Sequence, residues 1–215
     1  MLYLKSFCFN PFQQNTYLVY TDTGNAWIID PGNHSTSENQ ELKSFIDEKK
    51  LKLSRLLLTH GHIDHVLGNK FIFDTYGLLP EMHAEDLFFI ERMPQSAAMY
   101  GINCDPSPLP QHFIKAGEQI KLDQYVFEVL YTPGHSPGSV SFYNPENKLV
   151  IAGDVLFRGS IGRSDLPKGN HETLIRSIRE KLLVLGDDIK VYNGHGQATT
   201  TGYEKLNNPF LNDFN

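Results

Sequence analysis

Residues 59–65 read THGHIDH and place three histidines and one aspartate within six residues, directly after a short strand-like apolar run. Side chains two apart in an extended chain share a face, so His60 and His62 can approach the same ion. A bend into a helix would then redirect Asp64 and His65 toward an adjacent ion. Imidazole and carboxylate groups are ordinary zinc ligands and also suit iron or manganese. The segment therefore predicts a metal site, and the alternative is a solvated histidine-rich loop.

Three later segments each place one metal-competent side chain in a glycine-containing turn that follows an apolar run. They are His135 in TPGHSPGS, Asp154 in AGD and His195 in NGHG. Each segment is weak evidence for a metal site by itself, because a lone histidine in a turn is more often exposed than ligating and Gly-Asp is a common turn dipeptide. In layered α/β proteins, however, ligands collect beyond the carboxyl ends of strands. The segments can therefore converge on one site.

Strand-like and helix-like patterns intermix along the chain. Alternating or β-branched runs predict strands at 2–9, 15–21, 25–30, 53–59, 125–131, 139–143, 148–152 and 189–192. Apolar residues at helical spacing predict helices at 38–49, 65–76, 84–92, 170–184 and 201–206. The first three strands would form an antiparallel meander. The whole pattern predicts an α/β or α+β layered domain.

Composition narrows the class of protein. The chain has 215 residues, 40% of them hydrophobic, which suffices for one buried core and predicts a single domain over 1–215. The net charge is −6, and no basic run exceeds the pair Lys49-Lys50, which argues against a nucleic-acid partner. No apolar run approaches the roughly 20 residues of a membrane span. The only cysteines, Cys8 and Cys104, suggest no disulfide framework, so we expect a cytoplasmic protein.

Residues 93–113 contain four prolines and little periodicity. This predicts a long surface loop beside the site, which could be a lid or a purely structural loop. Residues 87–90 (LFFI) precede it, and we expect them in a helix core rather than in a substrate pocket.

The order THGHIDH, TPGHSPGS, AGD and GHG resembles the metallo-β-lactamase superfamily, and Asp30-Pro31-Gly32 is similar to its opening motif. Within it, GRSDLP at 162–167 and the tail GHGQATTTGYEKLNNPF resemble the small glyoxalase II-like (hydroxyacylglutathione hydrolase-like) enzymes. The resemblance implies a four-layer αββα sandwich with metals at one edge.

The same resemblance implies a role for each site residue. It implies two divalent ions, zinc first with iron or manganese as alternatives, held by His60, His62 and His135 on one side and by Asp64, His65 and His195 on the other. Asp154 would bridge them. Two cations lower the pKa of a shared water, so a metal-bound hydroxide becomes the expected nucleophile. Asp64 could also orient that hydroxide, and Asp30 could hold a ligand histidine, unless Asp30 only forms a turn.

A thioester of the S-acylglutathione type is the expected substrate, a small anionic molecule. Full-length glyoxalase II enzymes add a C-terminal helical domain that helps to hold glutathione, whereas only residues 196–215 follow His195. We therefore expect a metallo-β-lactamase-like domain without that addition. Arg163 is the candidate anion binder, because a guanidinium grips carboxylates with two hydrogen bonds. Its alternative role is a salt bridge to Asp165 or Glu180.

Other functions remain open from the sequence. A mononuclear iron persulfide dioxygenase would use only His60, His135 and Asp154, and a segment similar to GRSD occurs in such enzymes. A lactonase or another ester or phosphodiester hydrolase of the superfamily is a further alternative, and a binding protein without turnover is the last. The sequence does not set the oligomeric state.

The predicted bridging role of Asp154 gives a direct test. Asp154→Ala should remove both metals or nearly both, because each ion would lose a ligand. Elemental analysis of the purified variant measures this, and full occupancy with two metals per chain would contradict the bridge.

Overall fold

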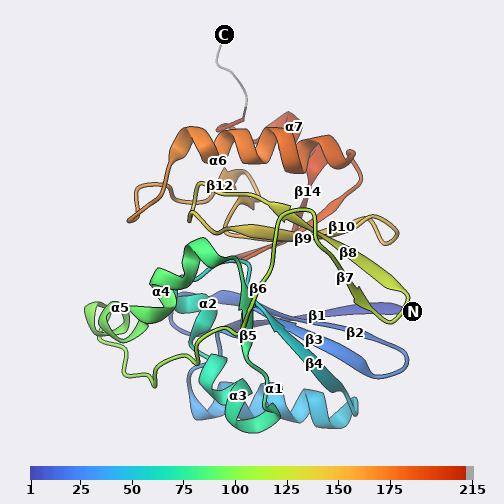
Figure 1. Cartoon of the computed structure of the whole chain (residues 1–215). Coiled ribbons are helices and arrows are strands. Elements are labelled where there is room, and N and C mark those ends of the chain that lie inside the picture. Colours follow the sequence, from blue (N-terminus) through green and yellow to red (C-terminus); the bar gives the residue numbers. More distant parts are fainter. Residues whose placement is uncertain (212–215) are drawn as a thin grey trace.

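The computed structural model describes residues 1–211. Two six-stranded sheets pack against each other, and helices cover their outer faces, which gives four layers (Figure 1). In Figure 1, α1 (Thr36–Glu48) and α3 (Asn69–Tyr76) lie below the sheets, and α6 (His171–Ser177) and α7 (Thr201–Asn207) lie above them. The predicted αββα sandwich is confirmed.

The first sheet has the order β1-β2-β3-β4-β5-β6. Its strands are β1 (Leu2–Phe9), β2 (Gln14–Thr21), β3 (Asn25–Ile29), β4 (Lys52–Leu57), β5 (Pro80–Met82) and β6 (His112–Phe113). The first three pair antiparallel, as the meander predicted, and β3 to β6 run parallel. Because parallel strands end on the same side, the loops after β3, β4 and β5 lie together.

The second sheet has the order β14-β13-β10-β9-β8-β7. Its strands are β7 (Gln119–Leu122), β8 (Tyr125–Tyr131), β9 (Val140–Asn144), β10 (Leu149–Gly153), β13 (Lys190–Asn193) and β14 (Thr199–Thr200). The pair β10 and β13 is parallel, and the other neighbours are antiparallel. A small hairpin of β11 (Leu156–Phe157) and β12 (Ser160–Ile161) follows β10.

Several helical predictions need correction. The predicted helix 65–76 is two helices, α2 (Ile63–Val66) and α3, which are separated at Leu67 and Gly68. The predicted helix 170–184 is α6 followed by a π-helical turn, Ile178–Leu182, and a 3₁₀ turn. In the second case the buried residues Leu174, Ile178 and Leu182 keep a spacing of four through the change in helical geometry, so the pattern alone could not show it.

The prediction of a loop over 93–113 is wrong at its start and at its last two residues, which form β6. Residues 93–99 form α5 (Met93–Met99), which follows α4 (Leu87–Glu91). Pro94 lies in the first turn of α5, where its missing N–H breaks no helical hydrogen bond. The prolines therefore marked a helix start as well as the irregular segment behind it.

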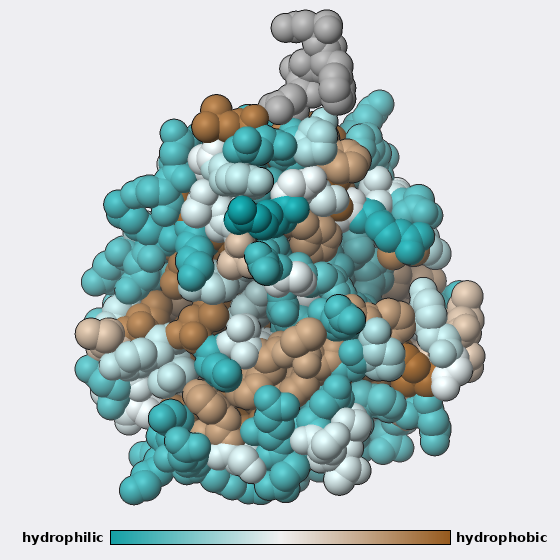
Figure 2. Space-filling view, turned by 180° about the vertical axis from the view of Figure 1, so that it is seen from behind, coloured by the Kyte–Doolittle hydropathy of each residue, from teal (hydrophilic) through white to brown (hydrophobic). Residues whose placement is uncertain are grey.

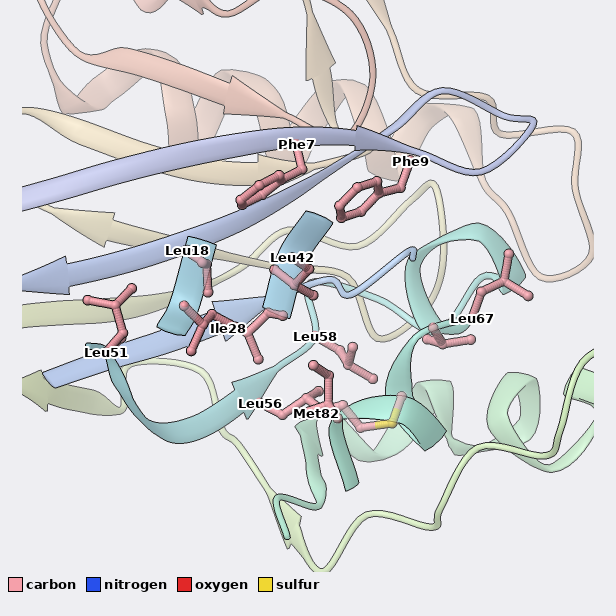
Figure 3. Close-up of a cluster of buried hydrophobic side chains, with 14 of the residues drawn as sticks. Phe7, Phe9, Leu18, Ile28, Leu42, Leu51, Leu56, Leu58, Leu67 and Met82 are labelled. Carbon is pink, nitrogen blue, oxygen red and sulfur yellow. The ribbon is translucent and has the colours of Figure 1, made fainter. Parts of the chain in front are cut away.

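Three apolar clusters hold the layers together. Between the sheets, the buried rings of Trp27 and Phe127 lie 5.3 Å apart. Beneath the first sheet, Phe7 and Leu18 point toward Leu42 of α1 (Figure 3). These side chains are fully or almost fully buried, and they fix the strands whose ends carry the site.

The surface seen in Figure 2 carries hydrophobic patches scattered among hydrophilic residues. Within residues 1–211, no helix has the length and apolar character needed to cross a bilayer. The two cysteines are unpaired, as expected from their isolated positions.

Candidate metal centre

Seven side chains from four loops meet where strands of both sheets end. They are His60, His62, Asp64 and His65 after β4, His135 after β8, Asp154 at the end of β10, and His195 after β13. The predicted convergence of these segments is confirmed. They form two groups, each with ligand-type atoms within 4.8 Å of one another.

The first group consists of His60, His62 and His135. His135 Nε2 lies 2.8 Å from His62 Nδ1 and 3.2 Å from His60 Nε2. The extended chain before α2 turns His60 and His62 to the same side, as their spacing predicts. Three ring nitrogens aimed at one point provide three of the four ligands of a tetrahedral ion and leave one position open.

The second group consists of Asp64, His65, Asp154 and His195. Asp154 Oδ1 lies 3.3 Å from His65 Nε2, and Asp154 Oδ2 lies 3.4 Å from His195 Nε2. The same Oδ2 is 3.5 Å from Nε2 of His135 in the first group. Asp154 therefore lies between the two groups, which is the position that a bridging ligand requires.

The outer ring nitrogens are held by oxygen atoms. Two rings contact side chains: His60 Nδ1 lies 3.1 Å from Thr59 Oγ1, and His65 Nδ1 lies 3.0 Å from Asp30 Oδ2. The other two contact backbone carbonyl oxygens. His135 Nδ1 lies 2.7 Å from that of Arg163, and His195 Nδ1 lies 3.1 Å from that of Phe12. Such contacts fix the ring orientation and the tautomer of metal-binding histidines. They leave Nε2 of each ring facing the centre.

Asp30 makes the contacts that its expected supporting role requires. Its carboxylate accepts hydrogen bonds from the Thr59 backbone N–H at 2.7 Å and from Thr59 Oγ1 at 2.6 Å, besides its contact with His65. Asp30 is buried and has φ of +51°, a conformation that non-glycine residues rarely adopt. Gln14 Nε2 lies 3.4 Å from the same ring nitrogen of His65.

The charges of the two groups differ. Burial and the neighbouring His135 lower the pKa of His62 to about 3, so its ring is a neutral donor. Burial also acts to lower the pKa of His195, but hydrogen bonds to Asp154 and Asp64 outweigh burial and raise that pKa to about 10. The carboxylates of the second group thus require positive charge beside them, which a divalent cation would supply.

The residues fit a pair of metal ions. His65 Nε2 and Asp154 Oδ1 are buried and, although they lie 3.3 Å apart, neither makes a hydrogen bond, which suits atoms that bind a metal ion. Gly194 leaves the necessary space, because a Cβ there would lie 1.9 Å from Asp154 Oδ1 and 2.7 Å from His65 Cε1. The donor set of nitrogen and carboxylate oxygen suits zinc, iron or manganese.

Sequence reasoning missed Asp86, a buried residue that links two of the loops. Its Oδ2 accepts hydrogen bonds from the Gly61 N–H at 2.8 Å and from Ser136 Oγ at 2.6 Å. Its Oδ1 accepts one from the Gly138 N–H at 2.6 Å. Gly61 belongs to THGHIDH and the other two residues belong to TPGHSPGS. No spacing or motif marks this aspartate in the sequence, because its partners are mainly backbone groups of distant segments.

Arg163 lies beside the centre, but its guanidinium is paired. Its Nε and one terminal nitrogen contact the two carboxylate oxygens of Asp165 at 3.0 and 2.9 Å. This salt bridge is one of the alternatives that the sequence left open. Arg163 also lines a cavity of about 540 Å³ above the metal groups, so anion binding remains a prediction for it.

The expectation for residues 87–90 is wrong at Phe89. Its ring lies 4.7 Å from that of His62 and lines the same cavity, whereas Ile90 is buried in the core. Helix α5, which replaces the start of the predicted loop, lines the cavity with Ser96 and Met99. The prediction that the 93–113 segment lies beside the site is confirmed for Ser96, Met99 and Tyr100.

Comparison with known families and proteins agrees with this geometry. The family model described as the metallo-beta-lactamase superfamily matches residues 9–195. The hydroxyacylglutathione hydrolase GloC of Haemophilus influenzae is 46% identical over 203 residues, which cover 94% of each chain.

Two solved structures resemble the whole fold. The BLEG-1 B3 metallo-beta-lactamase superposes with a TM-score of 0.90 at 33% identity, covering 98% of this chain and 100% of that one. TTHA1623 in a di-iron-bound form superposes with a TM-score of 0.87 at 37% identity, covering 96% and 100%.

The contacts of Asp86 predict a loss of metal retention when they are disturbed. Asp86→Asn should weaken metal retention about tenfold or more, because the new amide presents an N–H group to donors that need an acceptor. Replacing a residue that supports metal ligands commonly lowers metal affinity by this amount. Elemental analysis after dialysis against increasing chelator measures retention. Asp74→Asn, on the exposed face of α3, is the matched control. Equal retention in both variants would show that Asp86 does not support the centre.

Proposed function

This chain belongs to the metallo-β-lactamase superfamily and is a metal-dependent hydrolase, and from that premise we propose that it hydrolyses thioesters of the S-acylglutathione type. The observation that carries the proposal is the pair of complete ligand groups joined at Asp154. The 46% identity with GloC, a hydroxyacylglutathione hydrolase, supports the choice of a thioester. A cytoplasmic location, and partners limited to small anionic thioesters, stay predictions.

In the proposed site, His60, His62 and His135 hold one cation, and Asp64, His65 and His195 hold the other, with Asp154 shared. Two divalent cations there would activate water near neutral pH and polarise a carbonyl group. The reaction forms a bond from the water oxygen to the carbonyl carbon and breaks the carbon–sulfur bond. Its products are a carboxylate and a thiol, because one proton of the water goes to the leaving thiolate and the other is released to solvent.

The chain's own groups prepare this step. Asp64 is half-buried and lines the cavity, with Oδ2 3.0 Å from His195 Nε2, so its carboxylate can accept a hydrogen bond from the attacking water. The oxygen contacts of the outer ring nitrogens hold four histidines in place before substrate arrives. A prearranged site of this kind avoids reorganisation during the reaction.

A second candidate is hydrolysis of a β-lactam amide, favoured by the 33% identity with the BLEG-1 B3 metallo-beta-lactamase. The mononuclear iron dioxygenase remains the alternative with different chemistry. It would use only His60, His135 and Asp154 and would leave His62, Asp64, His65 and His195 without a function as ligands, although the structure assembles these side chains in the two groups.

Activity assays on the purified protein separate these candidates. The protein should hydrolyse S-lactoylglutathione, as followed by the loss of thioester absorbance, and Asp154→Ala prepared in parallel should not. Oxygen uptake with glutathione persulfide tests the dioxygenase, and a chromogenic cephalosporin tests the β-lactamase. Oxygen uptake or β-lactam turnover without thioester hydrolysis would reject the proposal.

Arg163 predicts a change in substrate affinity. Arg163→Ala should raise KM for S-lactoylglutathione about two- to fivefold with little change in kcat, because an exposed charge pair contributes up to about 1 kcal/mol and a contact with the substrate anion affects binding rather than the reacting bond. Steady-state kinetics measures this. Asp165→Ala is the matched variant, since it frees the guanidinium and should lower KM. If neither variant changes KM, Arg163 does not bind the substrate anion.

A further inference from the structure

The cavity above the metal groups is walled mainly by apolar side chains. Its volume of about 540 Å³ lies in the range of small-molecule sites. Half of the residues that line it are aromatic, aliphatic, methionine or proline. The metal ligands form one side, so any molecule that presents a carbonyl group to the ions must place its substituents against these walls.

Aromatic rings lie against the ligands on both sides of the centre. Phe89 lies 4.7 Å from His62 of the first group in an edge-to-face arrangement. Phe157 lies 6.2 Å from His195 of the second group. The space one or two bonds away from a carbonyl at the ions is therefore bordered by rings. Such a border favours another ring or a branched alkyl group over a small polar one.

A second pair of side chains extends the apolar wall outward. The rings of Phe12 and Tyr100 meet edge to face at 5.2 Å, and both line the cavity. Met99 and Tyr100, at the end of α5, are 84% and 56% exposed. Large apolar side chains left this open beside a catalytic site are available to cover an apolar ligand.

Lys and Arg side chains are scarce in the same walls. Within residues 1–211, Arg163 is the one Lys or Arg that lines the cavity, and Asp165 already occupies its guanidinium. Lys168 lies nearby but rests 4.0 Å from the ring of Phe88, outside the lining. A glutathione carrier brings two carboxylates, and these walls offer them few Lys or Arg partners. Binding strength must then come from the apolar walls.

From these contacts we propose that the enzyme selects thioesters whose acyl group carries an apolar, ring-sized substituent, which packs between Phe89 and the Phe12–Tyr100 pair. The inference rests on the proposed thioester hydrolysis and specifies its substrate class. The acyl side is assigned to these rings because Phe89 touches a ligand ring, whereas Arg163, the group suited to a hydrophilic thiol, is exposed.

A matched pair of substrates tests this assignment. S-lactoylglutathione and S-mandeloylglutathione share the thiol and the 2-hydroxyl group and differ only in methyl against phenyl. After division by their rates of uncatalysed alkaline hydrolysis, kcat/KM should be at least about tenfold higher for the mandeloyl ester, since even a single methylene in an apolar pocket is worth about tenfold or more.

Variants locate the preference in the cavity. Phe89→Ala and Tyr100→Ala should each reduce the mandeloyl-to-lactoyl ratio severalfold toward one. Tyr100 is exposed, so its replacement does not threaten folding. Phe73→Ala, which removes an exposed ring on α3 outside the cavity lining, is the matched control and should keep the wild-type ratio.

Binding without turnover gives a second readout. S-benzylglutathione and S-methylglutathione are stable thioethers that cannot be hydrolysed. They differ only in the group on the carbon bonded to sulfur, where the acyl carbon of a substrate would lie: phenyl in the first and hydrogen in the second. Calorimetric titration should show about tenfold tighter binding of the benzyl compound, and Tyr100→Ala should reduce the difference.

The outcomes separate the two claims. Hydrolysis of both esters with a ratio near one, or a high ratio that Phe89→Ala and Tyr100→Ala leave intact, would overturn the apolar acyl site while leaving thioester hydrolysis in place. Hydrolysis of neither ester would overturn the proposed function and the inference together.

Discussion

Two carboxylates placed among histidine rings impose the main constraint on this protein. Asp64 lies in α2 and Asp154 directly follows β10, and their ion partners within residues 1–211 are histidines rather than Lys or Arg. Buried negative charge is costly unless it is paired or bound to a cation. Ring nitrogens of the first group and carboxylates of the second together form a site suited to positive charge. The chemistry of the site follows from this requirement.

The sandwich meets that requirement by bringing strand ends together. The candidate ligands follow β4 in one sheet and β8, β10 and β13 in the other, so the packing of the two sheets determines the spacing of the groups. Asp86 adds a direct link between two of these loops. Asp30 contacts the ring of His65 and so helps to hold that histidine in place. The apolar core therefore contributes to catalysis indirectly, because it holds the strands from which the ligands extend.

Much of this arrangement was predictable from local patterns. The spacing of His60 and His62 gave their common face, and glycine turns after apolar runs marked the other ligand segments. Other features have no local signature. The carbonyl oxygens of Phe12 and Arg163 that orient two histidines could come from any residue type. Short strands such as β5, β11 and β14 offer too few residues to show alternation.

The errors also have physical causes. Proline-rich sequence suggested a loop where α5 begins, because proline is compatible with both a loop and a first helical turn. Phe89 was assigned to a helix core, since an apolar residue on a helix has the same pattern whether it faces the interior or a cavity. Whether such a residue faces the interior or a cavity depends on where distant loops lie, and the tertiary fold sets their positions.

Anomalous X-ray diffraction from crystals of the purified, metal-loaded protein tests the central claim most directly. Two peaks are expected, one at about 2.0–2.2 Å from nitrogens of His60, His62 and His135, and one at similar distances from Asp64, His65 and His195. Asp154 should contact both. A single ion in the first group, with the second group empty and Asp154 bound on one side only, would contradict a dinuclear centre.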